Sequence, residues 1–305
     1  MTPSSDTAIP ADDGLMRFQL EASGVRGVLV RLKSTWQAVL ERAPYPAPVA
    51  SCLGETLAAT ALMTGHAKVD GRLSVQLRGT GALRSLFAEC TRDGTLRGLA
   101  GYTEPLPDPL GPRAFGEDSM LAITIENVAI GGRDGMRHQG MVSLDADTMA
   151  EAFEGYFAQS EQLPTRMLLA ADSHCAVGLM LQKLPGSVDD LDGWPRAVAS
   201  FETLGRDELL STAPDELLYR LFHEDRVGIR DARPLRFACS CSRERVRSML
   251  ESLGREEALA SAQVGDPPAA EVSCAFCGRT YRLFRDEIQG LFGQLPAAPA
   301  PDTLQ

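Results

Sequence analysis

The sequence predicts an α+β fold: an N-terminal domain of mixed sheet and helix, a helical linker and a small C-terminal domain. Three observations predict it. Residues 14–183 alternate β-type runs with a few long helical segments, residues 184–235 carry short amphipathic pieces, and residues 236–294 hold two pairs of closely spaced cysteines. Residues 1–13 and 295–305 contain too little apolar surface to offset the cost of ordering, so we expect a disordered lead and a disordered tail.

The N-terminal domain is expected to begin with a β-hairpin. Residues 15–32 form two β-rich runs about a Ser-Gly turn. A short helix over 35–42 should follow, and then a buried helix over 49–64 that is rich in small and apolar residues. Gly65 is expected to close this helix as the first residue beyond its C-terminus.

The remainder of the domain reads as a series of strands with one more helix. Strands are predicted where apolar runs are separated by glycine-containing turns, over 72–78, 83–90, 95–100, 120–130 and 138–144. An amphipathic helix over 145–160 and a last hairpin over 165–184 complete the domain.

The linker carries a short helix with one apolar face. Within residues 211–222, Thr212 is a candidate N-cap, and the apolar face comprises Leu217, Leu218, Leu221 and Phe222. Because so short a helix is marginal in isolation, it must pack on something larger. We therefore expect a linker that docks on the N-terminal domain and that can be released from it.

Composition and charge exclude some classes of protein. The 305 residues carry a net charge of −11, which opposes binding to a phosphate backbone. The first residues form neither the basic nor the apolar region of a secretory signal, and no apolar run approaches about 18 residues. We expect a cytoplasmic protein without membrane contact, in which clustered thiols stay reduced and serve as metal ligands or redox centres.

Four cysteines form the strongest motif. Cys239 and Cys241 are separated by one residue, Cys274 and Cys277 by two, and 32 residues lie between the pairs. Two such pairs can provide the four thiolates of a tetrahedral zinc site with no open position for catalysis. We expect one Zn²⁺ per chain on these four sulfurs, and no enzyme activity.

Other interpretations of the motif remain open at this point. A thioredoxin-type dithiol is disfavoured, because the motif has a second pair and no βαβ pattern surrounds it. A purely structural zinc clasp without regulation is a serious alternative. A zinc ribbon that binds nucleic acid or a protein partner is favoured only by the local basic segment 236–247.

Arginines surround the cysteines in the sequence. They are Arg236, Arg243, Arg245, Arg279 and Arg282. Positive charge near thiolates stabilises them and favours attack by oxidants. Alternatively, some of these arginines lie on the outward face of a helix that starts at Ser242 as N-cap and ends at Gly254.

Oxidation would remove the thiolates from the metal. A Cys239–Cys241 bridge needs a bend, since residues two apart in an extended chain span about 6.6–7.2 Å and disulfides favour Cα separations of about 4.4–6.8 Å. A Cys274–Cys277 bridge is easier to form. Because structural zinc supplies about 10–16 kcal/mol and whole domains are stable by only about 5–15 kcal/mol, loss of the ion should unfold the C-terminal domain.

Several segments resemble one known family. They are FACSCSRERV, EVSCAFCGRTY, HQGMVSL and YFAQSEQLPTR. The chain resembles the bacterial redox-regulated 33-kDa chaperonin, heat shock protein 33. The resemblance extends from about Phe18 to Phe292. This resemblance implies a chaperone that holds unfolding client proteins without ATP. It also implies a zinc-loaded, inactive reduced state, and an oxidised homodimer in which zinc is lost and the linker unfolds.

The resemblance also assigns roles to individual residues. The four cysteines would be the ligands in the reduced state, and oxidation would pair Cys239 with Cys241 and Cys274 with Cys277. Ser240 stands where relatives often have Asp or Thr. Val246 stands where some relatives have a further cysteine, so four thiols make up the switch.

The remaining candidates have simpler explanations. Cys52, Cys90 and Cys175 lie in apolar patterns and are expected in the core. The histidines His66, His138, His174 and His223 show no ligand spacing and are expected as satisfied surface or edge groups. The Gly-x-Gly of RGTGALRSL lacks the other residues of a phosphate loop, so we expect a turn there and no bound nucleotide.

Overall fold

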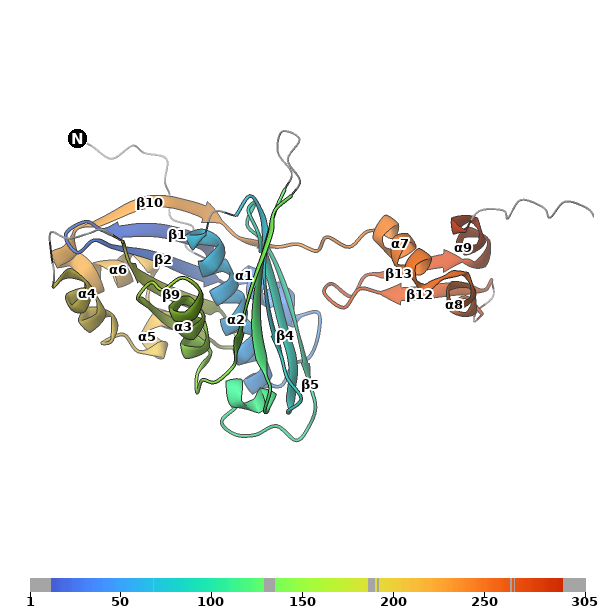
Figure 1. The fold of residues 1–305 in the computed structure, drawn as a ribbon, viewed down its shortest axis with the longest axis horizontal. Coiled ribbons are helices and arrows are strands. Elements are labelled where there is room, and N and C mark those ends of the chain that lie inside the picture. Colours follow the sequence, from blue (N-terminus) through green and yellow to red (C-terminus); the bar gives the residue numbers. More distant parts are fainter. Residues whose placement is uncertain are drawn as a thin grey trace, which may run out of the picture. The chain divides into compact units, whose positions relative to one another are not determined.

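The computed structural model describes residues 12–67, 69–128, 135–185, 190, 192–263, 265 and 267–292. The chain divides into two compact units, the first ending at Ala238 and the second beginning at Cys239. Both units combine helices with antiparallel strands, so the predicted α+β class is confirmed (Figure 1). None of the described helices combines the length and the apolar character needed to cross a bilayer.

The first unit contains a five-stranded antiparallel sheet in the order β10-β1-β2-β9-β8. Its strands are β1 (Asp13–Leu20), β2 (Val25–Leu32), β8 (Thr165–Ala171), β9 (Ala176–Lys183) and β10 (Val227–Pro234). The predicted hairpins β1–β2 and β8–β9 both form, and β2 pairs with β9 between them. Alternate side chains point to opposite faces, and both faces are apolar, so both must be covered.

A second sheet of six strands has the order β11-β5-β4-β3-β6-β7. Its strands are β3 (Gly71–Arg78), β4 (Leu83–Thr91), β5 (Thr95–Tyr102), β6 (Met120–Asn127), β7 (Arg137–Ser143) and β11 (Arg236–Phe237). The predicted strands of this region are confirmed to within a few residues, apart from residues 129 and 130 of the predicted strand 120–130, which lie outside the described residues. The two-residue β11, which pairs with β5 in parallel, comes directly before the second unit.

Helix α2 (Ala47–His66) lies between the two sheets and contacts strands of both. Its small residues allow this close approach: a Cβ on Gly54 would lie 2.5 Å from the Cβ of Ala171. The prediction that Gly65 ends this helix is wrong, because the helix continues through His66. Gly65 is required for packing instead, since a Cβ there would lie 2.7 Å from Leu15 Cδ1.

Three shorter elements complete this part of the unit: α1 (Ser34–Leu40), the 3-10 helix η1 (Pro112–Phe115) and α3 (Met149–Ser160). Helix α3 begins with a capping box, in which the Thr148 side chain accepts from the backbone of Glu151 and the Glu151 carboxylate accepts from the backbone of Thr148. The predicted helices over 35–42 and 145–160 are thus both present, with shifted ends.

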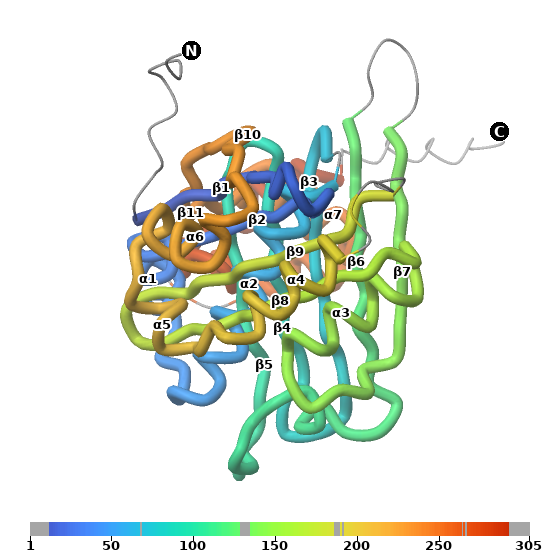
Figure 2. Tube along the Cα trace, turned by 90° about the vertical axis from the view of Figure 1, so that its left-hand side faces the viewer, coloured from blue at the N-terminus to red at the C-terminus, as the bar shows by residue number. Residues whose placement is uncertain are grey.

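The segment after β9 covers the outer face of the five-stranded sheet with α4 (Gly193–Phe201), α5 (Arg206–Ser211), α6 (Pro214–Phe222) and the 3-10 helix η2 (His223–Asp225). Figure 2 looks onto this side of the unit, with α4, α5 and α6 in front of the strands. One apolar cluster joins them to the sheet. The sheet side contributes Met16, Phe18, Leu20, Val25, Leu29, Ala170, Cys175, Val177, Leu179 and Leu181, and the covering segment contributes Ala197, Phe201, Leu204, Leu209, Leu217, Leu218 and Phe222. The segment therefore docks through apolar burial.

Two expectations for this segment are wrong. Residues 227–234 are not helical but form β10, because β1 has an unpaired edge that their backbone can satisfy. Thr212 is not the cap of α6, since the N-cap is Ala213, no side chain caps the helix, and Pro214 occupies the first turn.

The second unit has a hairpin of β12 (Ala269–Ser273) and β13 (Thr280–Phe284) with three helices, α7 (Arg243–Leu253), α8 (Arg255–Ala260) and α9 (Arg285–Leu291). Ser242 caps α7 by accepting from the backbone of Arg245, and Gly254 ends the helix with a φ of +88°, as predicted. Its described core holds few buried apolar residues, and three of them are alanine: Val246, Leu250, Ala258, Ala262, Ala270, Tyr281, Leu283 and Ile288. So small a core is marginal without a further crosslink.

Candidate metal centre

The structure brings the four predicted cysteines together. Cys239 and Cys241 lie in the segment before α7, and Cys274 and Cys277 lie in the turn between β12 and β13. Their sulfurs all lie within 4.8 Å of one another. The Cys239–Cys274 sulfurs are 3.6 Å apart and the Cys241–Cys277 sulfurs 3.4 Å apart, distances far beyond the roughly 2.05 Å of a disulfide.

The arrangement fits a tetrahedral ion. Zinc–thiolate bonds of about 2.3 Å in a regular tetrahedron correspond to sulfur–sulfur edges of about 3.8 Å. The two measured edges are within a few tenths of an ångström of that value. Four soft thiolates with no free position would hold an ion such as Zn²⁺ as a structural rather than catalytic metal.

A tight turn presents the second pair of thiols. The Gly278 amide donates to the Cys274 carbonyl (2.8 Å) and the Cys274 amide donates to the Arg279 carbonyl (2.9 Å). Gly278 adopts a φ of +69°, in the left-handed region that glycine reaches without strain. The glycine directly after the second cysteine therefore lets the chain turn back into β13 with both sulfurs on one side.

The four thiols are not equivalent. Partial burial opposes the ionisation of Cys241, but hydrogen bonds from Tyr281 and from the other three thiols outweigh it and lower the pKa of Cys241 to about 7. Burial, together with hydrogen bonds to the other three thiols, raises the pKa of Cys277 to about 12. In the metal-free site, Cys241 is thus the first of these two sulfurs to become a thiolate, the form that binds metal and reacts with oxidants.

Tyr281 is a site residue that the sequence reasoning missed. Its hydroxyl donates to the sulfur of Cys241, with an O···S distance of 3.1 Å. The one feature of the sequence that points to Tyr281 is its position on the strand that follows the second cysteine pair. A period-two pattern predicts only that the ring is buried, so the contact with a sulfur of the first pair depends on the folded hairpin.

The predicted arginines divide into different roles. Arg279 acts electrostatically on Cys241 and Cys277 and interacts with the Tyr281 hydroxyl. Arg243 pairs with Glu287 at 2.6 Å, and Arg282 pairs with Glu271 at 3.1 Å. Arg245 donates to the Ser240 hydroxyl. The charge of two of the predicted arginines is therefore balanced by carboxylates.

Arg236 belongs to the first unit, where it donates to the backbone carbonyl of Asp93 at 3.2 Å. The remaining cysteines are buried in that unit, as predicted. Burial raises the pKa of Cys52 to about 12 and that of Cys90 to about 11, and it also raises the pKa of Cys175. These thiols stay protonated and unreactive near neutral pH.

His66 corrects one expectation for the histidines. His138, His174 and His223 are exposed, but the His66 side chain is only 5% exposed because it lies at the end of α2, with its ring against Phe157. Its Nε2 lies 3.3 Å from Glu161, while its Nδ1 has no hydrogen-bond partner among the described residues.

The Gly-x-Gly segment forms the predicted turn between β3 and β4. A Cβ on Gly79 or Gly81 would lie 2.1 Å and 2.3 Å from the backbone oxygens of Phe115 and Ala114, respectively. These glycines therefore allow η1 to pack closely against the turn.

The fold and the site define a class of protein in which an α+β unit is followed by a small unit whose four clustered thiols could hold a metal ion. A family model described as Hsp33 protein matches residues 13–284. The 33 kDa chaperonin of Pseudomonas syringae pathovar tomato is 40% identical over 289 residues, covering 93% of this chain and 94% of the relative. That of Nitrosococcus oceani is 40% identical over 291 residues, with 95% and 98% covered.

A solved structure shows the same fold. The crystal structure of the 33 kDa chaperonin, a heat shock protein 33 homologue, from Thermotoga maritima superimposes with a TM-score of 0.76 over 92% of this chain and 97% of that chain, at 22% identity. This chain belongs to the Hsp33 family of chaperonins. The resemblance noted in the sequence is confirmed.

Proposed function

We propose that this protein is a redox-regulated holdase that protects unfolding and oxidatively damaged proteins from aggregation without ATP. In the reduced state Cys239, Cys241, Cys274 and Cys277 hold one Zn²⁺ and the protein is inactive. The observation that carries the proposal is the gathering of four sulfurs within 4.8 Å in a unit whose own apolar core is small. Such a unit depends on its crosslink for stability.

When bound, the ion would hold the two cysteine segments together and contribute about 10–16 kcal/mol to folding. Oxidation joins Cys239 to Cys241 and Cys274 to Cys277. For each bridge two thiolates give up two electrons, and one molecule of hydrogen peroxide takes up these electrons and two protons from solvent and is reduced to two of water. A sulfur in a disulfide no longer carries the negative charge that binds the metal, so the second unit loses its crosslink.

Release of the linker would then provide the client-binding surface. The linker 184–235 ends just after β10 and is joined to Cys239 by residues 236–238, which include β11. Unfolding of the second unit therefore removes the ordered chain that follows the linker. If α4, α5 and α6 leave the five-stranded sheet, the apolar face of Phe18, Leu29 and their neighbours is uncovered. A large exposed apolar face is what binds unfolded chains. The active form is a homodimer in the cytoplasm.

The proposal is tested by light scattering of a heat-denaturing client protein. Peroxide-treated protein should suppress the aggregation, and reduced, zinc-loaded protein should not. A Cys52→Ala variant is the matched control, because it removes a buried thiol of the first unit and should keep the switch. Equal aggregation with reduced and oxidised protein would reject the proposal.

The zinc-ribbon alternative predicts salt-sensitive nucleic-acid binding by the zinc-loaded form. Its support was the basic segment around the first cysteine pair, where Arg243 is now paired with Glu287 and Arg236 lies in the first unit. A thiol oxidoreductase would instead reduce insulin disulfides with turnover. Nucleic-acid binding or insulin reduction by this protein would support one of these two alternatives against the proposed holdase function.

A further inference from the structure

The hydroxyl group of Tyr281 is directed at a metal ligand by the fold of the second unit. Tyr281 lies on β13 opposite Val272 of β12, and its side chain is part of the apolar core. The residue is 9% exposed, so its ring has little freedom to turn away. Its hydroxyl nevertheless reaches the sulfur of Cys241 at 3.1 Å. Packing of the ring fixes the position of the Tyr281 hydroxyl, and this position allows the hydrogen bond to Cys241.

Arg279 interacts with the same hydroxyl. Its charge also acts on Cys241 and Cys277. A cation that accompanies the phenol oxygen makes the O–H group a stronger donor, because hydrogen bonds in a chain polarise one another. Arg279 thus acts on the Tyr281 hydroxyl, and this hydroxyl donates a hydrogen bond to the sulfur of Cys241.

Four thiolates around a divalent cation leave a formal charge near −2, and a hydrogen bond to one sulfur spreads part of that charge. A thiol bound to a metal is already ionised, so a hydrogen bond to it cannot add thiolate. The bond instead stabilises the lone pair of the sulfur and lowers its nucleophilicity toward an oxidant. The same contact also keeps the first cysteine pair in register with the hairpin.

We propose that Tyr281 is a positioning residue that stabilises the Cys241 thiolate as a metal ligand and slows its oxidation, so that it sets the oxidant threshold of the switch. This inference rests on the proposed function and names a regulator of the same site. In the step that Tyr281 slows, the Cys241 thiolate attacks one oxygen of hydrogen peroxide and the O–O bond breaks. A sulfenic acid forms, and the departing hydroxide takes a proton from solvent to become water. A second cysteine thiolate then attacks the sulfenic sulfur and closes the disulfide, and the displaced hydroxide takes a proton from solvent to become water.

The test is the Tyr281→Phe variant of the full chain, which keeps the ring and removes the donor. Two quantities are measured without any client: zinc affinity by competition with a chelator, and the rate of zinc release under peroxide with a chromogenic indicator. Since hydrogen bonds to charged groups are among the stronger ones, we expect about tenfold weaker zinc binding and several-fold faster release.

Thr280→Val is the matched control. It removes a hydroxyl from the neighbouring residue of the same strand, where the partner is the Ser273 hydroxyl at 2.9 Å rather than a sulfur. It should keep the zinc affinity and the zinc-release rate of the wild type. The Arg279→Ala variant leaves the tyrosine in place. We expect it to change both quantities in the same direction as Tyr281→Phe, but by less.

Wild-type affinity and release rate in Tyr281→Phe would overturn the inference, as would equal effects of Thr280→Val. If Tyr281→Phe fails to fold with zinc, as judged by circular dichroism, an unchanged Arg279→Ala overturns it and a faster-releasing Arg279→Ala supports it. These outcomes are distinct from failure of the proposed function, which would appear as wild-type protein that binds no zinc or does not switch.

Discussion

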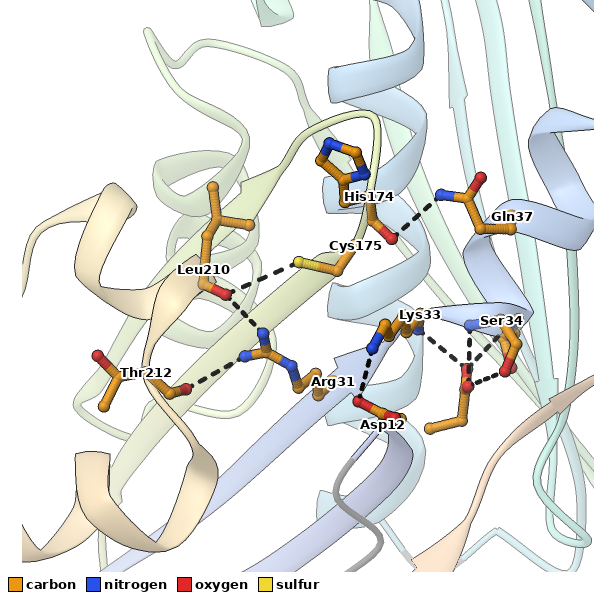
Figure 3. Close-up of polar contacts among 11 residues, drawn as sticks. Asp12, Arg31, Lys33, Ser34, Gln37, His174, Cys175, Leu210 and Thr212 are labelled. Atoms are coloured by element: carbon orange, nitrogen blue, oxygen red, sulfur yellow. Dashed lines mark hydrogen bonds and ion pairs between the residues drawn. The ribbon is translucent and has the colours of Figure 1, made fainter.

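Arg31 on β2 donates a hydrogen bond to the backbone carbonyl of Leu210 in α5, with an N···O distance of 2.6 Å (Figure 3). The same guanidinium reaches the Thr212 carbonyl at 3.2 Å. Carbonyls at the end of a helix have no partner within the helix, so a cation there satisfies them and favours the helix dipole. The sulfur of Cys175 also lies 3.8 Å from the Leu210 oxygen. The C-terminal end of α5 is thereby attached to the sheet.

Replacing Arg31 with methionine should loosen the linker in the reduced protein. The two hydrogen bonds involve a charged donor, so we expect docking of α5 to weaken by about 2 kcal/mol. Amide hydrogen exchange should then become faster in α5 and α6, while the strands keep their protection. Arg113→Met, which removes an exposed arginine paired with Asp147, is the control. Unchanged exchange in α5 would show that apolar burial alone holds the linker.

The surroundings of Glu55 on α2 predict that its contribution to protein stability decreases as the pH rises. Glu55 is 7% exposed, and its carboxylate pairs with Arg206 of α5. Burial raises the pKa of Glu55 above 4.5, although Arg206 and Ser51 lower it. Its contribution to stability is therefore fully present below the unfolded value of about 4.5 and is lost as the pH rises through the raised folded pKa.

The Glu55→Gln variant removes this ionisation, and Arg206 is exposed enough to remain solvated. We expect its thermal midpoint to rise relative to that of the wild type as the pH increases from about 4.5 to about 8. Glu41→Gln at an exposed position serves as the comparison and should show no such trend. A midpoint difference that does not change with pH would contradict the assignment.

Two glycines in helices should respond in opposite directions to alanine. A Cβ on Gly65 meets Leu15 and Val28 at 2.7–3.0 Å, so Gly65→Ala should cost about 1–3 kcal/mol in the free energy of unfolding. Gly155 in α3 has no atom within 4 Å of an added Cβ, so Gly155→Ala should stabilise the protein by about 0.5–1 kcal/mol. Urea denaturation of the first unit measures both, and a neutral Gly65→Ala would refute the packing role.

Removal of the proposed metal should unfold the second unit while the core of the first unit stays folded. With a chelator under reducing conditions, we expect α7, α9 and the β12–β13 hairpin to lose amide protection, because the small core supplies too little stability by itself. The core in which α2 packs between the two sheets does not involve the second unit and should remain protected. Added zinc should restore the second unit. Full protection of the metal-free hairpin would contradict a structural role for the ion.

Much of the fold could be predicted because its signals are local. The β1–β2 hairpin, the cap at Ser242 and the end of α7 at Gly254 each follow from a few neighbouring residues and their backbone preferences. The cysteine spacing likewise predicted which four thiols gather. None of these needs information from distant parts of the chain.

Short segments of the sequence were enough to predict the α+β class, a cysteine-bearing C-terminal region and its four candidate ligands, because periodicity, caps and motif spacing are local properties. Tertiary structure alone decided that Val227–Pro234 is a strand, since only the unpaired edge of β1 requires its backbone. It also decided that Gly65 serves packing and that the Tyr281 hydroxyl meets Cys241. Such contacts join residues far apart in the chain, and their energies exist only once the surfaces meet.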